Sequence, residues 1–228
     1  DQIEALAKKY FGGIAKGPDP ERPKVEEPEQ KSPKYLKVKD KHAKLPAFWL
    51  AWKAPARREK DSYVLNLLQG VLSMGPSSRL YRRLVKEDQI ALTVSCSYEE
   101  RRGPSNISFF VLTKPGNDPE KVKKVLMEEI NKVKTDKVSD EELEKAKNHI
   151  LKLLFSSGSY YSLQGSLGRA ENIAQNAAFF GKPDLVNEDI NTYLSLTADD
   201  LKRVANQVFS ENGVTTVDVV PDSGKLVQ

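Results

Sequence analysis

The sequence predicts an α+β domain in which a largely antiparallel sheet is packed by a block of helices. Two observations predict this class. Segments with strand composition come in neighbouring pairs, and segments with helix periodicity follow one another, in the order β-β-α-α-β-β-α-α-α-α-α-β. Helices grouped in this way favour α+β over a doubly wound parallel sheet, in which strands and helices alternate.

The first 33 residues predict a helix and a linker ahead of the domain. Apolar residues recur at helical spacing over 3–11, and Gly12-Gly13 follows where helices commonly end. Residues 16–33 hold five prolines among charged residues, which is typical of an extended linker. We expect the terminal helix of a preceding repeat at 1–15, a Pro-rich linker at 16–33, the domain at 34–222 and a tail at 223–228.

Five segments have the composition of strands, with alternating or continuous apolar residues and turn residues at their ends. The predicted strands are 35–39, 45–54, 90–98, 107–113 and 214–220, with a charged hairpin turn over 99–105. Side chains alternate across a strand, so Trp49 is expected on one face of the sheet and Phe48 and Trp52 on the other. One of these two faces is expected to be core.

Capping signals set the expected helix boundaries. The residues expected to cap helices are Asp61, Ser77 or Ser78, Asp118 before Pro119, Ser139 with Glu142, and Thr197. The predicted helices of the domain are 61–74, 79–87, 118–134, 139–155, 160–180, 185–194 and 198–209. Residues 160–180 are apolar on several sides, which predicts a mostly buried helix.

Composition excludes several classes of function. The 36 Lys and Arg residues exceed the 32 Asp and Glu residues by a net charge of +4, but they are spread along the chain and form no nucleic-acid footprint. No apolar run reaches the roughly 18 residues of a membrane span, so we expect none. Cys96 lies in a predicted strand and is interpreted as a buried core residue, which leaves the compartment open between periplasm and cytoplasm.

The sequence offers neither a catalytic nor a metal site of its own, and its substrate-binding residues are unknown. His42, in a charged loop, and His149, on a predicted solvated helix face, are far apart in sequence. A serine nucleophile needs a histidine base, so Ser77 and Ser78 are interpreted as helix caps. The acidic cluster 140–144 fits the first turn of a helix, where the helix dipole favours negative charge.

Residues 68–91 combine a leucine-rich helix, a Gly-Pro-Ser-Ser turn, Ser78-Arg79-Leu80, a second helix and a small-residue strand. This segment resembles the second, non-zinc-binding repeat of the insulinase/pitrilysin family of zinc metallopeptidases. The resemblance continues through Pro115-Gly116-Asn117 and the helix around Glu141 to Pro221, so that it covers 35–221. The Gly12-Gly13 helix end and the Pro-rich run also look like the end of a first repeat and its linker.

The resemblance implies two α+β repeats that face each other across a chamber. The first repeat carries H-x-x-E-H and a distal Glu, whose side chains hold zinc and activate its water. This chain lacks that motif, so zinc is expected in the partner repeat. The family's second repeat often lends an Arg and, seven residues later, a Tyr. In this chain these positions fall on Val85 and Leu92. A one-residue gap would bring Arg83 near the position of the Arg, but Tyr98 then lies too far along the chain to match the Tyr. No catalytic residue is therefore assigned.

The leading interpretation is a non-catalytic domain that completes a proteolytic chamber with a zinc-bearing repeat and helps to enclose a peptide substrate. An edge of its sheet is expected to pair with that peptide by strand addition, with 106–113 as the segment to test. A second interpretation keeps the fold but makes the chain a non-proteolytic scaffold or assembly subunit. A third, a nucleic-acid-binding module, conflicts with the dispersed charge.

Overall fold

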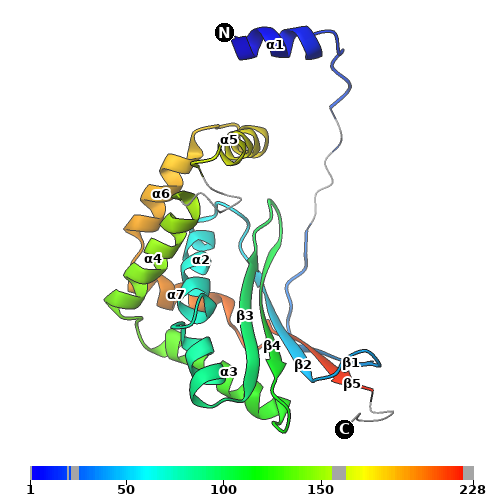
Figure 1. The fold of residues 1–228 in the computed structure, drawn as a ribbon, viewed down its shortest axis with the longest axis vertical. Helices are drawn as coiled ribbons and strands as arrows, with labels where there is room; N and C mark the ends of the chain where they lie inside the picture. Colours follow the sequence, from blue (N-terminus) through cyan, green and yellow to red (C-terminus); the bar gives the residue numbers. More distant parts are fainter. Residues whose placement is uncertain (1, 20, 22–25, 156–162, 223–228) are drawn as a thin grey trace.

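The computed structural model describes residues 2–19, 21, 26–155 and 163–222. They form a sheet in the order β1-β5-β2-β4-β3, with the helices of the domain on one side of it (Figure 1). Strand β1 pairs with β5 in parallel, and the other pairings are antiparallel. The prediction of a largely antiparallel α+β domain is confirmed.

The five predicted strands form with their ends displaced by two residues at most. They are β1 (Lys34–Asp40), β2 (Ala47–Ala54), β3 (Ala91–Glu99), β4 (Ser105–Thr113) and β5 (Thr215–Pro221). The helices are α1 (Gln2–Phe11), α2 (Lys60–Ser73), the π-helix η1 (Tyr81–Glu87), α3 (Pro119–Thr135), α4 (Asp140–Phe155), α5 (Ser166–Phe180), α6 (Leu185–Ser195) and α7 (Ala198–Val208). Among the described residues, no helix is long and apolar enough to cross a membrane.

Three of the expected caps are confirmed. Asp118 accepts a hydrogen bond from the amide of Glu120 at the start of α3. Ser139 and Glu142 form a reciprocal capping box at α4, with bonds of 3.0 and 3.1 Å. Thr197 and Asp200 form another at α7. Each satisfies amide groups that the first helical turn leaves without a partner.

Two of the expected caps are wrong. Helix α2 begins one residue before Asp61, with Glu59 as its N-cap, and the Asp61 carboxylate pairs with Arg203 at 2.7 Å instead. The helical turns that lead into η1 do begin after Ser78, whose carbonyl accepts from the Arg82 amide at 2.9 Å, but no serine side chain caps them. The Ser78 hydroxyl donates back to the carbonyl of Gly75, and the Ser77 hydroxyl accepts a bond from Lys145. In both places a tertiary or turn partner competes successfully for the side chain.

The prediction of a buried helix over 160–180 is also wrong. Helix α5 begins at Ser166, and of its described side chains only Asn176 is buried. Residues 160–162 lie outside the described residues. Leu167 and Ile173 are 72% and 52% exposed, because α5 lies at the outer end of the helix block (Figure 1). Apolar content predicts burial only where another element packs against the helix.

The core lies between the sheet and the helix block. Phe48 and Trp52 on β2 point into it, and Trp52 makes edge-to-face contacts with Phe109 on β4 and Phe209 after α7, with ring centroids 6.0 and 5.3 Å apart. The Trp52 indole N–H donates to the carbonyl of Ser210 at 2.9 Å. The predicted alternation on β2 is therefore confirmed, since Trp49 lies on the opposite face.

A polar cluster fastens α6 to the start of α2. Asp189 accepts hydrogen bonds from the Tyr63 hydroxyl at 2.5 Å and from the Arg58 guanidinium at 2.9 Å. Burial and the bond to Asp189 raise the pKa of Tyr63. Arg58 has a positive φ of 71°, and its guanidinium lies 5.3 Å from the centre of the Phe180 ring. The cluster thus links the start of α2 to α5 and α6.

Candidate functional site

The face of the sheet opposite the helices carries two rows of apolar side chains. Strand register sets the first row as Leu36, Val217, Trp49 and Phe110, and the second as Val38, Val219, Ala47 and Leu112. Directly paired residues share a face, so each row crosses β1, β5, β2 and β4. We call these eight residues the open face.

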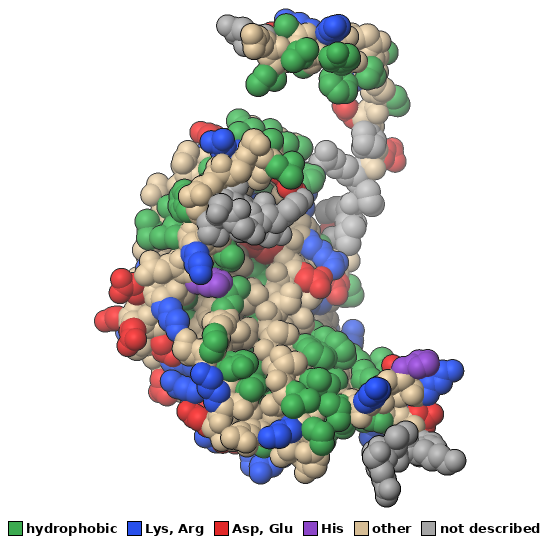
Figure 2. All heavy atoms as spheres, in the orientation of Figure 1, with side chains coloured by type: hydrophobic (Ala, Val, Ile, Leu, Met, Phe, Trp, Pro, Cys, Tyr) green, Lys and Arg blue, Asp and Glu red, His purple; other side chains and the backbone are tan. Residues whose placement is uncertain are grey.

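The open face is a continuous apolar surface. Leu36, Val38 and Trp49 are 56%, 38% and 38% exposed, and the Trp49 and Phe110 rings are in contact with centroids 4.5 Å apart. Figure 2 shows hydrophobic side chains gathered over the strands near the β1–β2 end of the molecule. Contiguous apolar surface of this kind is typical of a face that another protein segment covers. The face on which Trp49 lies is predictable from the alternation of side chains along one strand. The two rows are not, because they depend on the register of four strands.

The linker approaches the domain across the polar end of this same face. Gln30 donates to the carbonyl of Val214 at 2.9 Å and bonds the hydroxyl of Thr215 at 3.2 Å. Lys53 donates to the carbonyls of Glu27 and Pro28. Residues 27–30 are therefore held against the domain, although they fall within the range expected to be linker.

The two edges of the sheet are β1 and β3. The segment 106–113, which the strand-addition hypothesis uses as its test segment, lies in β4 between β2 and β3 and is not an edge. At the β3 edge, the Cys96 amide donates to the Ser73 hydroxyl at 2.9 Å, and Gln69 donates to the Cys96 carbonyl at 2.8 Å. Side chains of α2 thus occupy the middle of that edge, a common protection against strand pairing. Neither Gln69 nor Ser73 is recognisable from sequence in this role.

The two positions assigned to the family's helper Arg and Tyr lie in different environments. Val85, in η1, is half-buried and packs against the core, whereas Leu92, at the start of β3, is 45% exposed. Arg83, the alternative to Val85, forms an ion pair with Asp88 at 3.0 Å. Gln89 adopts a positive φ of 52°, a conformation that usually favours glycine. Neither valine nor leucine can stabilise charge or transfer a proton.

The remaining candidate residues do not assemble into a site. His42 follows β1, where its amide donates to Asp40, and His149 lies on α4. Cys96 is buried, and burial raises the pKa of its thiol. Among the described residues, no group of three or more His, Cys, Asp or Glu side chains is arranged to hold a metal ion.

Glu142 in the acidic cluster has a structural partner. Its two carboxylate oxygens accept bonds from Nε and Nη2 of Arg79, both at 2.7 Å. Bonding to Arg79 is the largest cause that holds the pKa of Glu142 below its usual value. This pair connects the segment before η1 to the first turn of α4.

Removing this clamp should weaken the fold in a pH-dependent manner. We expect Arg79→Ala to lower the free energy of unfolding by about 1.5–3 kcal/mol, and Arg79→Lys to retain part of it without the two-pronged geometry. The folded-state pKa of Glu142 is lowered, so the stabilisation is present above about pH 5 and is lost as pH falls through that pKa. Urea unfolding at pH 7 and pH 3 measures this, and an equal loss at both would contradict the assignment.

Comparisons with known proteins agree with this architecture. Residues 1–150 match the family described as the peptidase M16 inactive domain. The zinc protease PqqE of Helicobacter pylori is 27% identical over 224 residues, which cover 96% of this chain and 49% of the relative. The chain therefore spans about half the length of that relative.

Two crystal structures share the fold. A protease from Helicobacter pylori superposes with a TM-score of 0.86 at 24% identity, covering 96% of this chain and 52% of that one. A peptidase M16 inactive domain from Pseudomonas fluorescens does so with a TM-score of 0.76 at 16% identity, covering 96% and 50%. The resemblance to the non-zinc-binding repeat is confirmed. With its match over residues 1–150 and its α+β architecture, the chain belongs to the peptidase M16 inactive domain family of zinc proteases.

Proposed function

We propose that this chain is the non-catalytic domain of a zinc peptidase, and that it completes the proteolytic chamber by packing against a zinc-bearing repeat. The observation that carries this proposal is the open face. Its eight apolar residues lie on the side of the sheet away from the helices, and Leu36, Val38 and Trp49 are exposed. Covering an apolar surface of this kind with a partner removes it from water and lowers the free energy.

The path of the linker supports the same arrangement. Residues 27–30 contact the polar end of the sheet face on which the open face lies, so the chain reaches the domain from that side. Helix α1, at the other end of the linker, has no buried residue, and Ile3, Tyr10 and Phe11 are 83%, 65% and 68% exposed. We infer that α1 is the terminal helix of the preceding repeat.

Enclosure of a peptide is the second part of the proposal. Strand addition at β3 would require the bonds of Gln69 and Ser73 to Cys96 to break. We therefore propose that this domain contributes a wall of the chamber, while the repeat with H-x-x-E-H contributes the zinc and the general base. The domain lends no catalytic side chain at Val85 or Leu92.

Metal analysis and a peptide-cleavage assay test the division of labour. The purified chain alone is expected to hold no stoichiometric zinc and to cleave nothing. Mixed with the H-x-x-E-H repeat encoded upstream or in a neighbouring gene, it should restore cleavage. Stoichiometric zinc together with cleavage by the chain alone would overturn the proposal. Stable association without cleavage would favour the scaffold function.

A charge on the open face should weaken association with the partner repeat. Leu36 is 56% exposed on an edge strand, so Leu36→Lys is expected to leave the fold intact. We expect the variant to bind the partner repeat about tenfold more weakly or worse, which corresponds to a loss of about 1.4 kcal/mol of binding free energy. Lys37→Ala changes the neighbouring exposed side chain on the opposite face of the strand and serves as the matched control. Calorimetric titration measures both; equal affinities for the two variants would remove the open face from the interface.

A further inference from the structure

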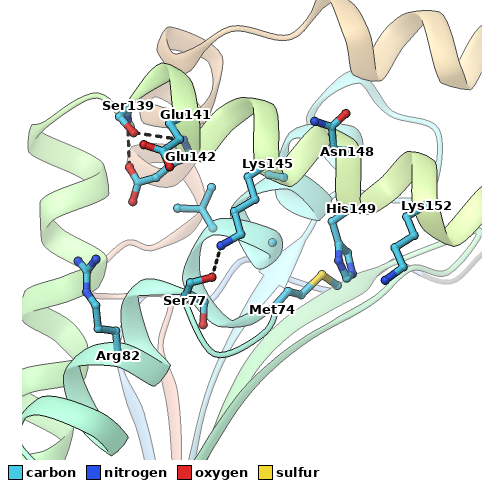
Figure 3. Close-up of a pocket in the computed structure, with 14 residues that line it drawn as sticks. Met74, Ser77, Arg82, Ser139, Glu141, Glu142, Lys145, Asn148, His149 and Lys152 are labelled. Atoms are coloured by element: carbon cyan, nitrogen blue, oxygen red, sulfur yellow. Dashed lines mark hydrogen bonds between the residues drawn. The ribbon is translucent and has the colours of Figure 1, made fainter.

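A second feature of the molecule, separate from the open face, is a pocket between the C-terminal end of α2 and the side of α4 that runs from its first turn to Lys152 in its last. Its volume is about 480 Å³, within the range of small-molecule sites. Figure 3 shows Lys145, His149 and Lys152 on α4, above the turn that carries Met74 and Ser77. The three basic residues follow at intervals of four and three, which places them on one side of the helix.

The pocket holds positive charge that its own acids do not balance. The charged side chains that line it are Arg82, Glu141, Glu142, Lys145 and Lys152. Glu142 is held by Arg79, and Arg82 lies 3.4 Å from Glu87. Lys145 bonds a neutral hydroxyl, that of Ser77, and among the described residues neither Lys145 nor Lys152 forms an ion pair. With Glu142 and Arg82 paired in this way, the lining leaves two solvent-exposed lysines, Lys145 and Lys152, against one acid, Glu141.

The remaining wall of the pocket is apolar. Val71 and Met74 from α2 and Ala146 from α4 line it, and Gly70 lets the two helices approach closely. A β-carbon at Gly70 would lie 3.3 Å from that of Ala146. A ligand matched to this wall carries an apolar group next to its charge.

His149 lies between the two lysines on α4 and lines the pocket with them. It is half-buried in the pocket wall, although the sequence predicted a solvated helix face. Burial and the Lys152 ammonium lower the pKa of His149. Of the two lysines, Lys152 is thus the one whose charge acts on the imidazole.

We propose that this pocket binds a carboxylate attached to an apolar group, with Lys145 and Lys152 neutralising the charge and Val71 and Met74 contacting the apolar part. A carboxylate brings a single negative charge to the two lysines, whereas a phosphate would bring a second charge into a pocket that Glu141 also lines. The free carboxyl end of a peptide and a fatty acid share this chemistry.

Histidine-ring NMR of the whole chain tests the proposal directly, because the protein has only two histidines. The probes are N-acetyl-leucine, octanoate, the neutral N-acetyl-leucinamide and acetate. A bound carboxylate should raise the pKa of His149 with saturation at millimolar concentrations, and the ring signals of His42, after β1, serve as the internal control. Because binding raises this pKa, affinity should increase as pH falls below about 6.5. A response to N-acetyl-leucine alone assigns the site to peptide ends, and one to octanoate alone assigns it to fatty acids.

Variants separate this site from a general charge effect. Lys145→Gln and Lys152→Gln should each weaken binding about tenfold, as expected for loss of one charge-assisted bond. Lys147→Gln, on the same helix but bonded to the carbonyl of Leu194 outside the pocket, should bind normally. Equal responses to acetate or the neutral amide, equal loss in Lys147→Gln, or no saturable shift of His149 would each overturn the proposal. None of these measurements needs the partner repeat, so this site and the proposed function stand or fall separately.

Discussion

Replacing Trp52 with alanine should lower the free energy of unfolding by about 3–5 kcal/mol, as large-to-small substitutions of buried aromatics do. Trp52 is 2% exposed and lies between Phe109 and Phe209. Its removal leaves a cavity among these rings and leaves the Ser210 carbonyl without its 2.9 Å donor. Both effects act at the junction of β2, β4 and the end of α7, where the sheet meets the helix block.

The same strand supplies the matched control. Trp49 lies three residues earlier on the opposite face, is 38% exposed, and contacts Phe110. Trp49→Ala should therefore cost no more than about 1.5 kcal/mol, the upper range for one aromatic pair. Urea unfolding compares the two variants, with the free energy of unfolding of each obtained from the midpoint and slope of its transition. Equal losses would contradict the assignment of the two faces of β2.

Replacing Lys123 with methionine should have a similarly large effect for an electrostatic reason. The Lys123 ammonium on α3 lies 2.7 Å from the Asp218 carboxylate on β5, and both residues are buried. Tyr35 on β1 donates to the same carboxylate at 2.7 Å. Without the lysine, Asp218 keeps its place in the interior with its charge uncompensated. We expect a loss of about 3–5 kcal/mol at pH 7, as for other broken buried pairs.

Two further variants distinguish a buried charge from a general loss of a lysine. Lys123→Met combined with Asp218→Leu should recover most of the lost stability, because the pair is then replaced by apolar groups. Lys137→Met removes the exposed pair with Asp199, whose side chains are 60% and 69% exposed, and should cost about 0–1 kcal/mol. Thermal or urea unfolding of the three variants distinguishes these two causes. A double variant as unstable as the single one would show that Lys123 acts through packing.

Local signals predicted the elements of this domain well, and the errors have a common cause. The caps at Asp118, Ser139 and Thr197 were predictable because the bonding atoms lie within three residues of each other. Asp61 failed as a cap because Arg203, distant in sequence, takes its carboxylate. Helix α5 was expected to be buried, although no described element covers Leu167 or Ile173.

The features of the candidate site likewise divide into those with a local sequence signal and those that depend on contacts between distant residues. The missing H-x-x-E-H motif, and valine and leucine at positions 85 and 92, are properties of the sequence, and the prediction that this chain supplies no catalytic residue rests on them. The alternation of Trp49 and Trp52 is likewise local. By contrast, the cover of the β3 edge by Gln69 and Ser73 joins residues more than twenty positions apart and carries no local signal.

The sequence by itself determined the fold class and the family resemblance, because periodicity, capping and motif spacing are short-range properties. Only the tertiary structure decided that Leu36, Val217, Trp49 and Phe110 form one row of an open face, and that Lys145, His149 and Lys152 line a pocket with Met74. Strand register and helix packing depend on contacts between distant segments. These contacts form because they bury apolar surface contributed by two or more segments, and the sequence of one segment does not specify its partner.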